Sequence, residues 1–143
     1  MLLKEFFSHA NWLAIGVAAI VYFALGAVWY SALFQKPWME GHKIPKPGPE
    51  DMARMKKQMP LLMLKTFLMG AAMAICISLL AFGLESSRCM SGIKIGLLLS
   101  VVASVPMVMS HMYLQKPLKV IIIDAAYHIV SIILMSIIIS IWH

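Results

Sequence analysis

The sequence predicts an all-α membrane protein, with four transmembrane helices in a bundle and a short amphipathic surface helix in the first loop. Of its 143 residues, 62% are hydrophobic and 13% are charged, whereas soluble domains have about 45–50% apolar and about 25% charged residues. The apolar residues form four runs, each close to the ~20 residues that a helix needs to cross ~30 Å of hydrocarbon. This composition excludes an ordinary soluble enzyme, a disordered chain and a nucleic-acid-binding protein as leading classes.

The four runs are expected to form one transmembrane domain over residues 1–143. Because backbone polar groups in lipid have to be satisfied within the segment, the runs are helices and not strands. The predicted helices cover approximately residues 11–34, 61–84, 93–114 and 118–142. The last two connections are short, so the helices that they join are expected to be antiparallel neighbours.

The first connection, residues 35–60, is the longest. Its stretch 41–49 is too rich in Pro and Gly for regular structure. Pro49 and the acidic residues after it then favour the start of a helix, and the methionines that follow recur at helical spacing. We therefore expect a basic amphipathic helix on the membrane surface. A solvated loop is the alternative.

Basic residues are distributed unequally between the two ends of the predicted helices. The connection 35–60 carries six of the twelve, and Lys116 and Lys119 add two on the same side, whereas Lys4, Arg88 and Lys94 lie on the other. Lys and Arg accumulate on the cytoplasmic side of membrane proteins. We therefore expect loops 35–60 and 115–117 in the cytoplasm and both termini outside. We therefore attribute the net charge of +6 to the basic cytoplasmic loops, and we expect no nucleic-acid partner.

The fourth predicted helix carries a polar face in an otherwise apolar segment. Asp124, Tyr127, His128 and Ser131 are separated by three, four and seven residues from the first, which puts them on one side of a helix. A carboxylate in a membrane helix costs about 2.5–3.5 kcal/mol on an insertion scale. The face is therefore expected to turn away from lipid, either as a functional site or as a lock that packs the helices.

Partners for Asp124 follow from counting residues along each helix. His111 and Lys65 lie at a depth comparable to that of Asp124, so either is expected to neutralise the carboxylate. Tyr30 shares this depth, and a buried phenol needs a hydrogen-bond partner. We expect Tyr30 to bond to Asp124, His128 or a backbone carbonyl, and Trp29 to pack against a neighbouring helix or subunit. The alternative makes both aromatic residues interfacial anchors.

Neither a catalytic residue nor a cofactor is predicted. His111, Asp124 and His128 include two imidazoles and a carboxylate, which suit Zn or Fe, but their spacing matches no metal motif, and a metal stays unassigned. Phosphate loops, nucleophile elbows and paired glycosidase carboxylates are not found.

Small residues predict where helices approach closely. Gly92, Gly96 and Ser100 recur every four residues, a pattern that lets helix backbones come together, and Gly26 offers a similar opening in the first helix. The contacts form either within one chain or between subunits. Because four helices leave no room for an aqueous pore, transport would need an oligomer, and a homodimer is the first expectation.

Two segments resemble the signatures of a known family. Residues 26–34, with Lys36 and Trp38 after them, resemble the first-helix signature of the DUF1761 family, and residues 123–128 resemble its second. DUF1761 proteins are small bacterial membrane proteins of uncharacterised function. The resemblance implies four helices in a bacterial inner membrane, and it implies no activity.

Three functions are consistent with these features. The first is a non-enzymatic, homo-oligomeric membrane protein that handles a small solute or ion at the polar site. The second is a structural or accessory subunit whose basic loop docks on lipid or on a partner protein. The third is an intramembrane metalloenzyme.

Overall fold

The computed structural model describes residues 2–45 and 47–142, and all the regular structure in that part of the chain is helical. Four of the helical segments are long and apolar enough to cross a membrane, which confirms the predicted all-α class with four membrane-spanning helices. The elements in chain order are α1 (Leu2–His9), α2 (Trp12–Val28), the π-helical turn η1 (Trp29–Leu33), α3 (Gln35–Gly41), α4 (Pro49–Gly83), α5 (Cys89–Tyr113) and α6 (Leu118–Ile141).

The first membrane segment consists of α2 and η1 without a break. Its start is defined by Asn11, whose side-chain oxygen accepts a hydrogen bond from the backbone N–H of Ala14 at 3.1 Å. This is a typical N-cap, because it satisfies one of the free N–H groups of the first turn. At the other end, the N–H of Phe34 donates to the carbonyl of Trp29, which closes the wider π turn.

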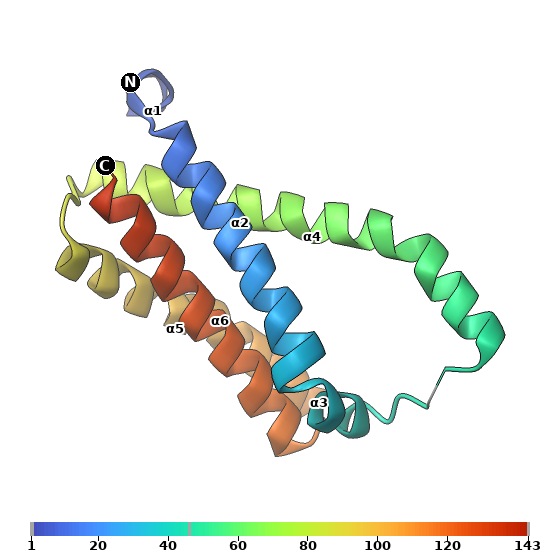
Figure 1. Ribbon diagram of the computed structural model, residues 1–143. Helices are drawn as coiled ribbons and strands as arrows, with labels where there is room; N and C mark the ends of the chain where they lie inside the picture. The colour runs from blue at the N-terminus through green and yellow to red at the C-terminus, as the bar shows by residue number, and fades with distance from the viewer. Residues whose placement is uncertain (1, 46, 143) are drawn as a thin grey trace.

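Helix α4 differs most from the prediction. The residues expected to form a separate surface helix are the first turns of one continuous helix, Pro49–Gly83. Its 35 residues extend about 52 Å at ~1.5 Å per residue, more than the ~30 Å of a hydrocarbon core. Pro60 lies inside the helix and removes one backbone hydrogen bond, which is a common cause of bending. Figure 1 shows that α4 bends and that its first turns stand clear of the other helices.

Two further helices were not expected. Residues 35–41, part of the predicted loop, form α3, which packs against α6. At the N-terminus, α1 turns Phe6 inward, where the ring is 1% exposed and lies 5.9 Å from the ring of Phe82. The burial of one aromatic face explains why so short a segment is helical.

Helix α6 is the centre of the packing. It contacts α2, α3, α4 and α5, whereas α2 lies between α4 and α6. In Figure 1, α2, α5 and α6 run along a common direction while α4 crosses them, so the arrangement is not a regular four-helix bundle. The two termini lie at one end, where the Asn11 amide donates to the carbonyl of Trp142 at 2.6 Å. The α5–α6 turn and α3 lie at the other.

Close approach between α5 and α6 depends on small residues. A Cβ added to Gly92 would lie 2.7 Å from the carbonyl oxygen of Ser136, and one added to Gly96 would lie 2.7 Å from the Cα of Ile133. Ser100 is buried on the same face. This stripe therefore meets α6 of its own chain.

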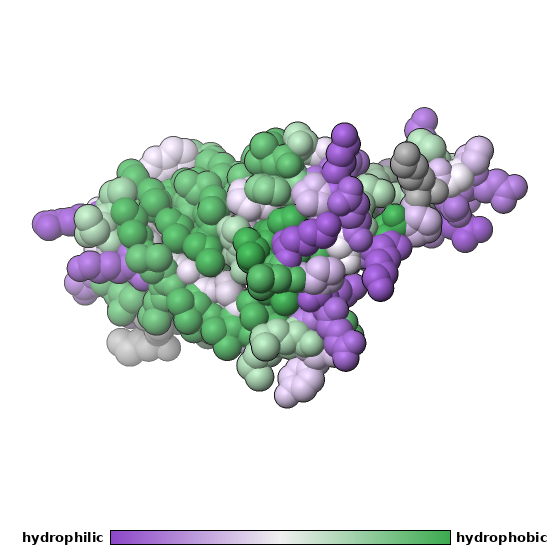
Figure 2. Space-filling view, turned by 90° about the horizontal axis from the view of Figure 1, so that it is seen from below, coloured by the Kyte–Doolittle hydropathy of each residue, from purple (hydrophilic) through white to green (hydrophobic). Residues whose placement is uncertain are grey.

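The surface separates into an apolar belt and polar ends. Figure 2 shows hydrophobic residues over much of one face, with hydrophilic residues gathered mainly towards one side. Exposed basic residues include Lys36, Lys43, Arg54, Lys56 and Lys57, which lie in or beside α3 and the first turns of α4. This distribution suits a protein whose apolar belt is covered by lipid.

The α5–α6 contact gives a stability prediction. Gly96→Ala is expected to destabilise the protein by about 1–3 kcal/mol, because the new Cβ meets backbone that has to shift. Gly16→Ala is the matched control, since nothing lies within 4 Å of its added Cβ, and the better helix propensity of Ala should stabilise it by up to about 1 kcal/mol. Unfolding in detergent measures both. Equal stabilisation of the two variants would contradict the close contact.

Candidate functional site

The Asp124 carboxylate is the centre of the candidate site. The residue is 8% exposed, and its two oxygens accept three side-chain hydrogen bonds. Oδ1 accepts the Tyr30 hydroxyl at 2.8 Å and the Trp38 indole N–H at 3.0 Å, and Oδ2 contacts Nε2 of His111 at 2.9 Å. The predicted Tyr30–Asp124 bond is present. These three partners come from η1, α3 and α5, so one carboxylate on α6 joins three other elements.

Two adjacent aromatic residues of the π-helical turn both reach α6. In η1, the Trp29 indole donates to the carbonyl of Ile123 at 3.1 Å, next to the Tyr30–Asp124 bond. Single π turns are frequent at functional sites. Trp29 was expected to pack against a neighbouring helix or a subunit, and it packs against a neighbouring helix of the same chain.

His111 lies between two oxygen atoms. Its Nδ1 is 3.0 Å from the carbonyl oxygen of Met107, which can only accept, and its Nε2 is 2.9 Å from Oδ2 of Asp124. Which of the two contacts is a donated hydrogen bond depends on the tautomer of the ring. The two contacts together fix the orientation of the imidazole between α5 and α6.

Lys65 does not take part in this cluster. Its side chain is exposed on α4, whereas Asp124 is covered by η1, α3 and α5. Of the two alternative partners expected for the carboxylate, the structure pairs His111 with it, and Lys65 is not the partner. A lysine on a surface helix keeps its ammonium group hydrated by extending along that surface.

The remaining polar residues of α6 lie deeper and face other partners. Tyr127 donates its hydroxyl to the carbonyl of Tyr22 at 3.2 Å, next to Gly26, where an added Cβ would lie 2.8 Å from that hydroxyl. The His128 ring lies 5.3 Å from the Tyr127 ring. Ser131 donates to the carbonyl of His128 at 3.2 Å, within its own helix. The structure thus brings Tyr30 and His111 to Asp124, while His128 lies against Tyr127 and Ser131 bonds within its own helix.

Trp38 and His42 are site residues that the sequence analysis did not identify. The two rings lie 4.3 Å apart, and the Lys116 ammonium group donates to Nδ1 of His42 at 3.1 Å. Burial, and then the neighbouring Lys116, lower the pKa of the His42 imidazole, which favours its neutral form. Together with the Lys119–Glu40 ion pair at 3.2 Å, these contacts hold α3 over Asp124.

A crevice of about 310 Å³ lies beside this cluster, between α2 and α4. Tyr22, Gly26 and Ala27 line it from α2, and its α4 side includes Leu62, Met63 and Thr66. Phe23, Tyr30, Met59 and Tyr127 complete the lining. Through Tyr30, the crevice is one side chain away from Asp124.

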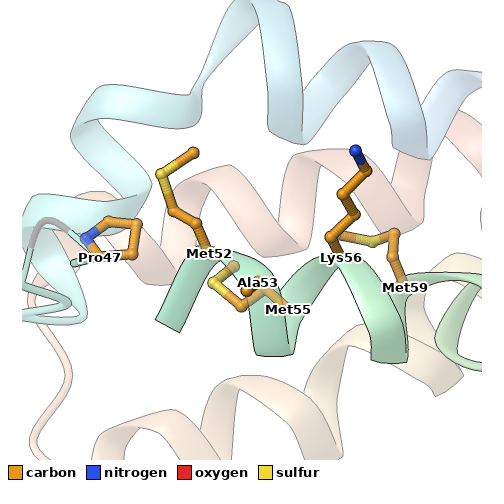
Figure 3. A pocket seen from close by; sticks show the side chains of 6 residues that line it. All are labelled: Pro47, Met52, Ala53, Met55, Lys56 and Met59. Atoms are coloured by element: carbon orange, nitrogen blue, oxygen red, sulfur yellow. The ribbon is translucent and has the colours of Figure 1, made fainter. Parts of the chain in front are cut away.

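A second hollow, of about 470 Å³, lies on the first turns of α4. It is lined by Pro47, Met52, Ala53, Met55, Lys56 and Met59. Figure 3 shows the three methionine side chains along one stretch of the helix, with the amine of Lys56 at the tip of an extended chain. The methionines are well exposed, so this hollow is an apolar surface bordered by positive charge.

Metal binding finds no support in the described part of the chain. No group of three or more His, Cys, Asp and Glu side chains there is arranged to hold a metal ion. His111 and Asp124 are paired, but the third member of the set considered above, His128, faces Tyr127 instead.

Comparison with known proteins identifies one family. Residues 13–140 match the family described as "Protein of unknown function (DUF1761)". No curated protein and no solved structure matches the chain. The matched range includes both segments that form the Asp124 cluster, the turn that carries Tyr30 and the helix that carries Asp124.

Proposed function

The chain belongs to the DUF1761 family, and from that premise we propose that it is a non-enzymatic membrane protein that binds a small solute or ion at the Asp124 cluster. The observation that carries the proposal is the buried carboxylate–imidazole pair beside a crevice between two membrane-spanning helices. Ionisable residues inside membrane segments are usually associated with ligand or ion pathways.

Energetics favour a functional role over simple packing. A buried charged pair contributes little net stability, since apolar residues of similar volume often stabilise a protein as well or better. This chain nevertheless supplies three donors from three elements to keep one carboxylate among apolar helices. Solute binding would explain why the carboxylate and its three donors are present, whereas packing alone does not explain it.

The proposed assembly is a homodimer. The crevice lies on the side of α2 and α4, where Ala27, Leu62 and Met63 are exposed, rather than along an axis through the four helices. A solute that crosses the membrane would therefore need a surface from a second copy. Light scattering of the detergent-solubilised protein is expected to give twice the chain mass, and a monomer at every concentration would contradict it.

Asp124→Asn tests the binding site. A thermal-shift screen of small solutes and inorganic ions should find a ligand that stabilises the wild type, by about 2.7 kcal/mol at 100 times its Kd. The variant should stay folded and lose this effect, because asparagine keeps the size and acceptor oxygen of the side chain but not its charge.

Asp51→Asn is the matched control, since Asp51 is exposed at the start of α4. It should leave the stabilisation by the ligand unchanged. If Asp124→Asn unfolds in detergent and no solute or ion stabilises the wild type, Asp124 is a packing lock and the proposal fails.

A second candidate function is docking on an anionic lipid surface. It is favoured by the hollow on α4, where Met52, Met55 and Met59 form an apolar surface beside Lys56. Basic amphipathic segments bind at the headgroup level through apolar burial and attraction to anionic lipids. In this proposal the loops at residues 35–60 and 115–117 face the cytoplasm, and both termini lie outside.

Hydrogen exchange in nanodiscs tests the docking function. Phosphatidylserine should slow amide exchange over residues 50–60 relative to phosphatidylcholine alone, since each surface basic residue contributes about 1 kcal/mol of attraction. Replacing Arg54, Lys56 and Lys57 together by glutamine should abolish the difference, while Lys94→Gln, on another helix, should keep it. Equal exchange in both lipids would exclude this role.

A further inference from the structure

We propose that the crevice between α2 and α4 binds an apolar organic amine, a compound with a hydrocarbon body and one ammonium group, which enters from the lipid. This inference rests on the proposed solute-binding role of the Asp124 cluster and names the class of solute. It follows from the hydrogen-bonding capacity of the crevice wall, its aromatic rings and the carboxylate behind it.

The hydroxyl groups of the wall are acceptors. Tyr30 donates its proton to Asp124 at 2.8 Å, Tyr127 donates to the carbonyl of Tyr22 at 3.2 Å, and Thr66 donates to the carbonyl of Leu62 at 2.9 Å. A hydroxyl has one proton and two lone pairs, so these three oxygens have only lone pairs left for a ligand. A ligand that contacts these three hydroxyls therefore meets acceptors, which favours a hydrogen-bond donor as its polar group.

Aromatic rings make the same wall suitable for a positive charge. The Tyr127 ring centroid lies 5.5 Å from that of Tyr22 and 5.2 Å from that of Tyr30, so three phenol rings meet at one corner of the crevice. Ring faces attract an ammonium group within about 6 Å of their centroids. Gly26 lets the Tyr127 ring lie close to α2 at this corner, because an added Cβ would lie 2.8 Å from the Tyr127 hydroxyl. Lysine and arginine are absent from the lining of the crevice.

Asp124 supplies the negative charge. Its hydrogen bond polarises the Tyr30 hydroxyl, whose oxygen becomes a better acceptor for an ammonium N–H. The carboxylate lies directly behind this hydroxyl, so it attracts a cation held at the phenol rings.

The rest of the wall suits a hydrocarbon body and entry from the bilayer. Leu62, Met63 and Ala27 are exposed on helices whose outer surfaces lie in the apolar belt. The volume of about 310 Å³ is at the lower end of the range for small-molecule sites. These properties favour a small amine with one aromatic or aliphatic group.

Calorimetry of the purified full-length protein in nanodiscs tests the inference with phenethylamine, phenethyl alcohol and phenylacetate. The amine should bind most tightly, because it alone carries a positive charge, whereas the alcohol offers one neutral donor and the carboxylate offers only acceptors. Tyr30→Phe should weaken its binding about tenfold, as expected for one lost hydrogen bond. Tyr113→Phe, at an exposed tyrosine, should have no effect.

A pair of alanine variants tests the location. Ala27→Trp should abolish amine binding by filling the crevice, whereas Ala24→Trp, at an exposed position of α2 outside the lining, should leave it unchanged. Amine binding that survives Ala27→Trp, or that is equal for all three compounds, would overturn the inference. If another solute stabilises the protein through Asp124 while the amine does not bind, only this inference fails. If no ligand requires Asp124 for binding, both this inference and the proposed function fail.

Discussion

A carboxylate among apolar helices has to be surrounded by hydrogen-bond donors, because leaving it unpaired in a low-dielectric environment costs several kcal/mol. Asp124 imposes this constraint on α6, the helix that the other membrane segments pack around. Three donors meet it from η1, α3 and α5. Much of the geometry at this end of the molecule follows from bringing those donors to one point.

The π turn and α3 both supply donors at this end. From η1, Trp29 donates to the carbonyl of Ile123 and Tyr30 donates to Asp124, so both aromatic residues face α6. Helix α3 then returns the chain towards α6, so that Trp38 covers the carboxylate. Contacts of Lys116 and Lys119 with this segment hold it in place.

Hydropathy and helical periodicity were sufficient to predict the four long helices, because the length of an apolar run and the depth of a residue are properties of one segment. Counting residues along each helix also placed Tyr30, His111 and Asp124 at a similar depth in the membrane. The differences concern relations between segments. Lys65 is at a suitable depth, as His111 is, but lies on the outer surface of α4. Trp38 belongs to the predicted connection 35–60, where its contact with Asp124 depends on the unexpected helix α3. The predicted helix begins at residue 61, whereas α4 begins at Pro49 and continues through Pro60.

The central claim is that the Asp124 carboxylate couples separate elements of the fold, and a double-mutant cycle between Tyr30→Phe and Asp124→Leu tests it most directly. The free energy of unfolding in detergent is measured for the wild type, both single variants and the double variant. A coupling energy of about 1–3 kcal/mol is predicted, as for residues in one hydrogen-bond network. Effects that add to within about 0.5 kcal/mol would show that the two side chains act independently and would contradict the claim.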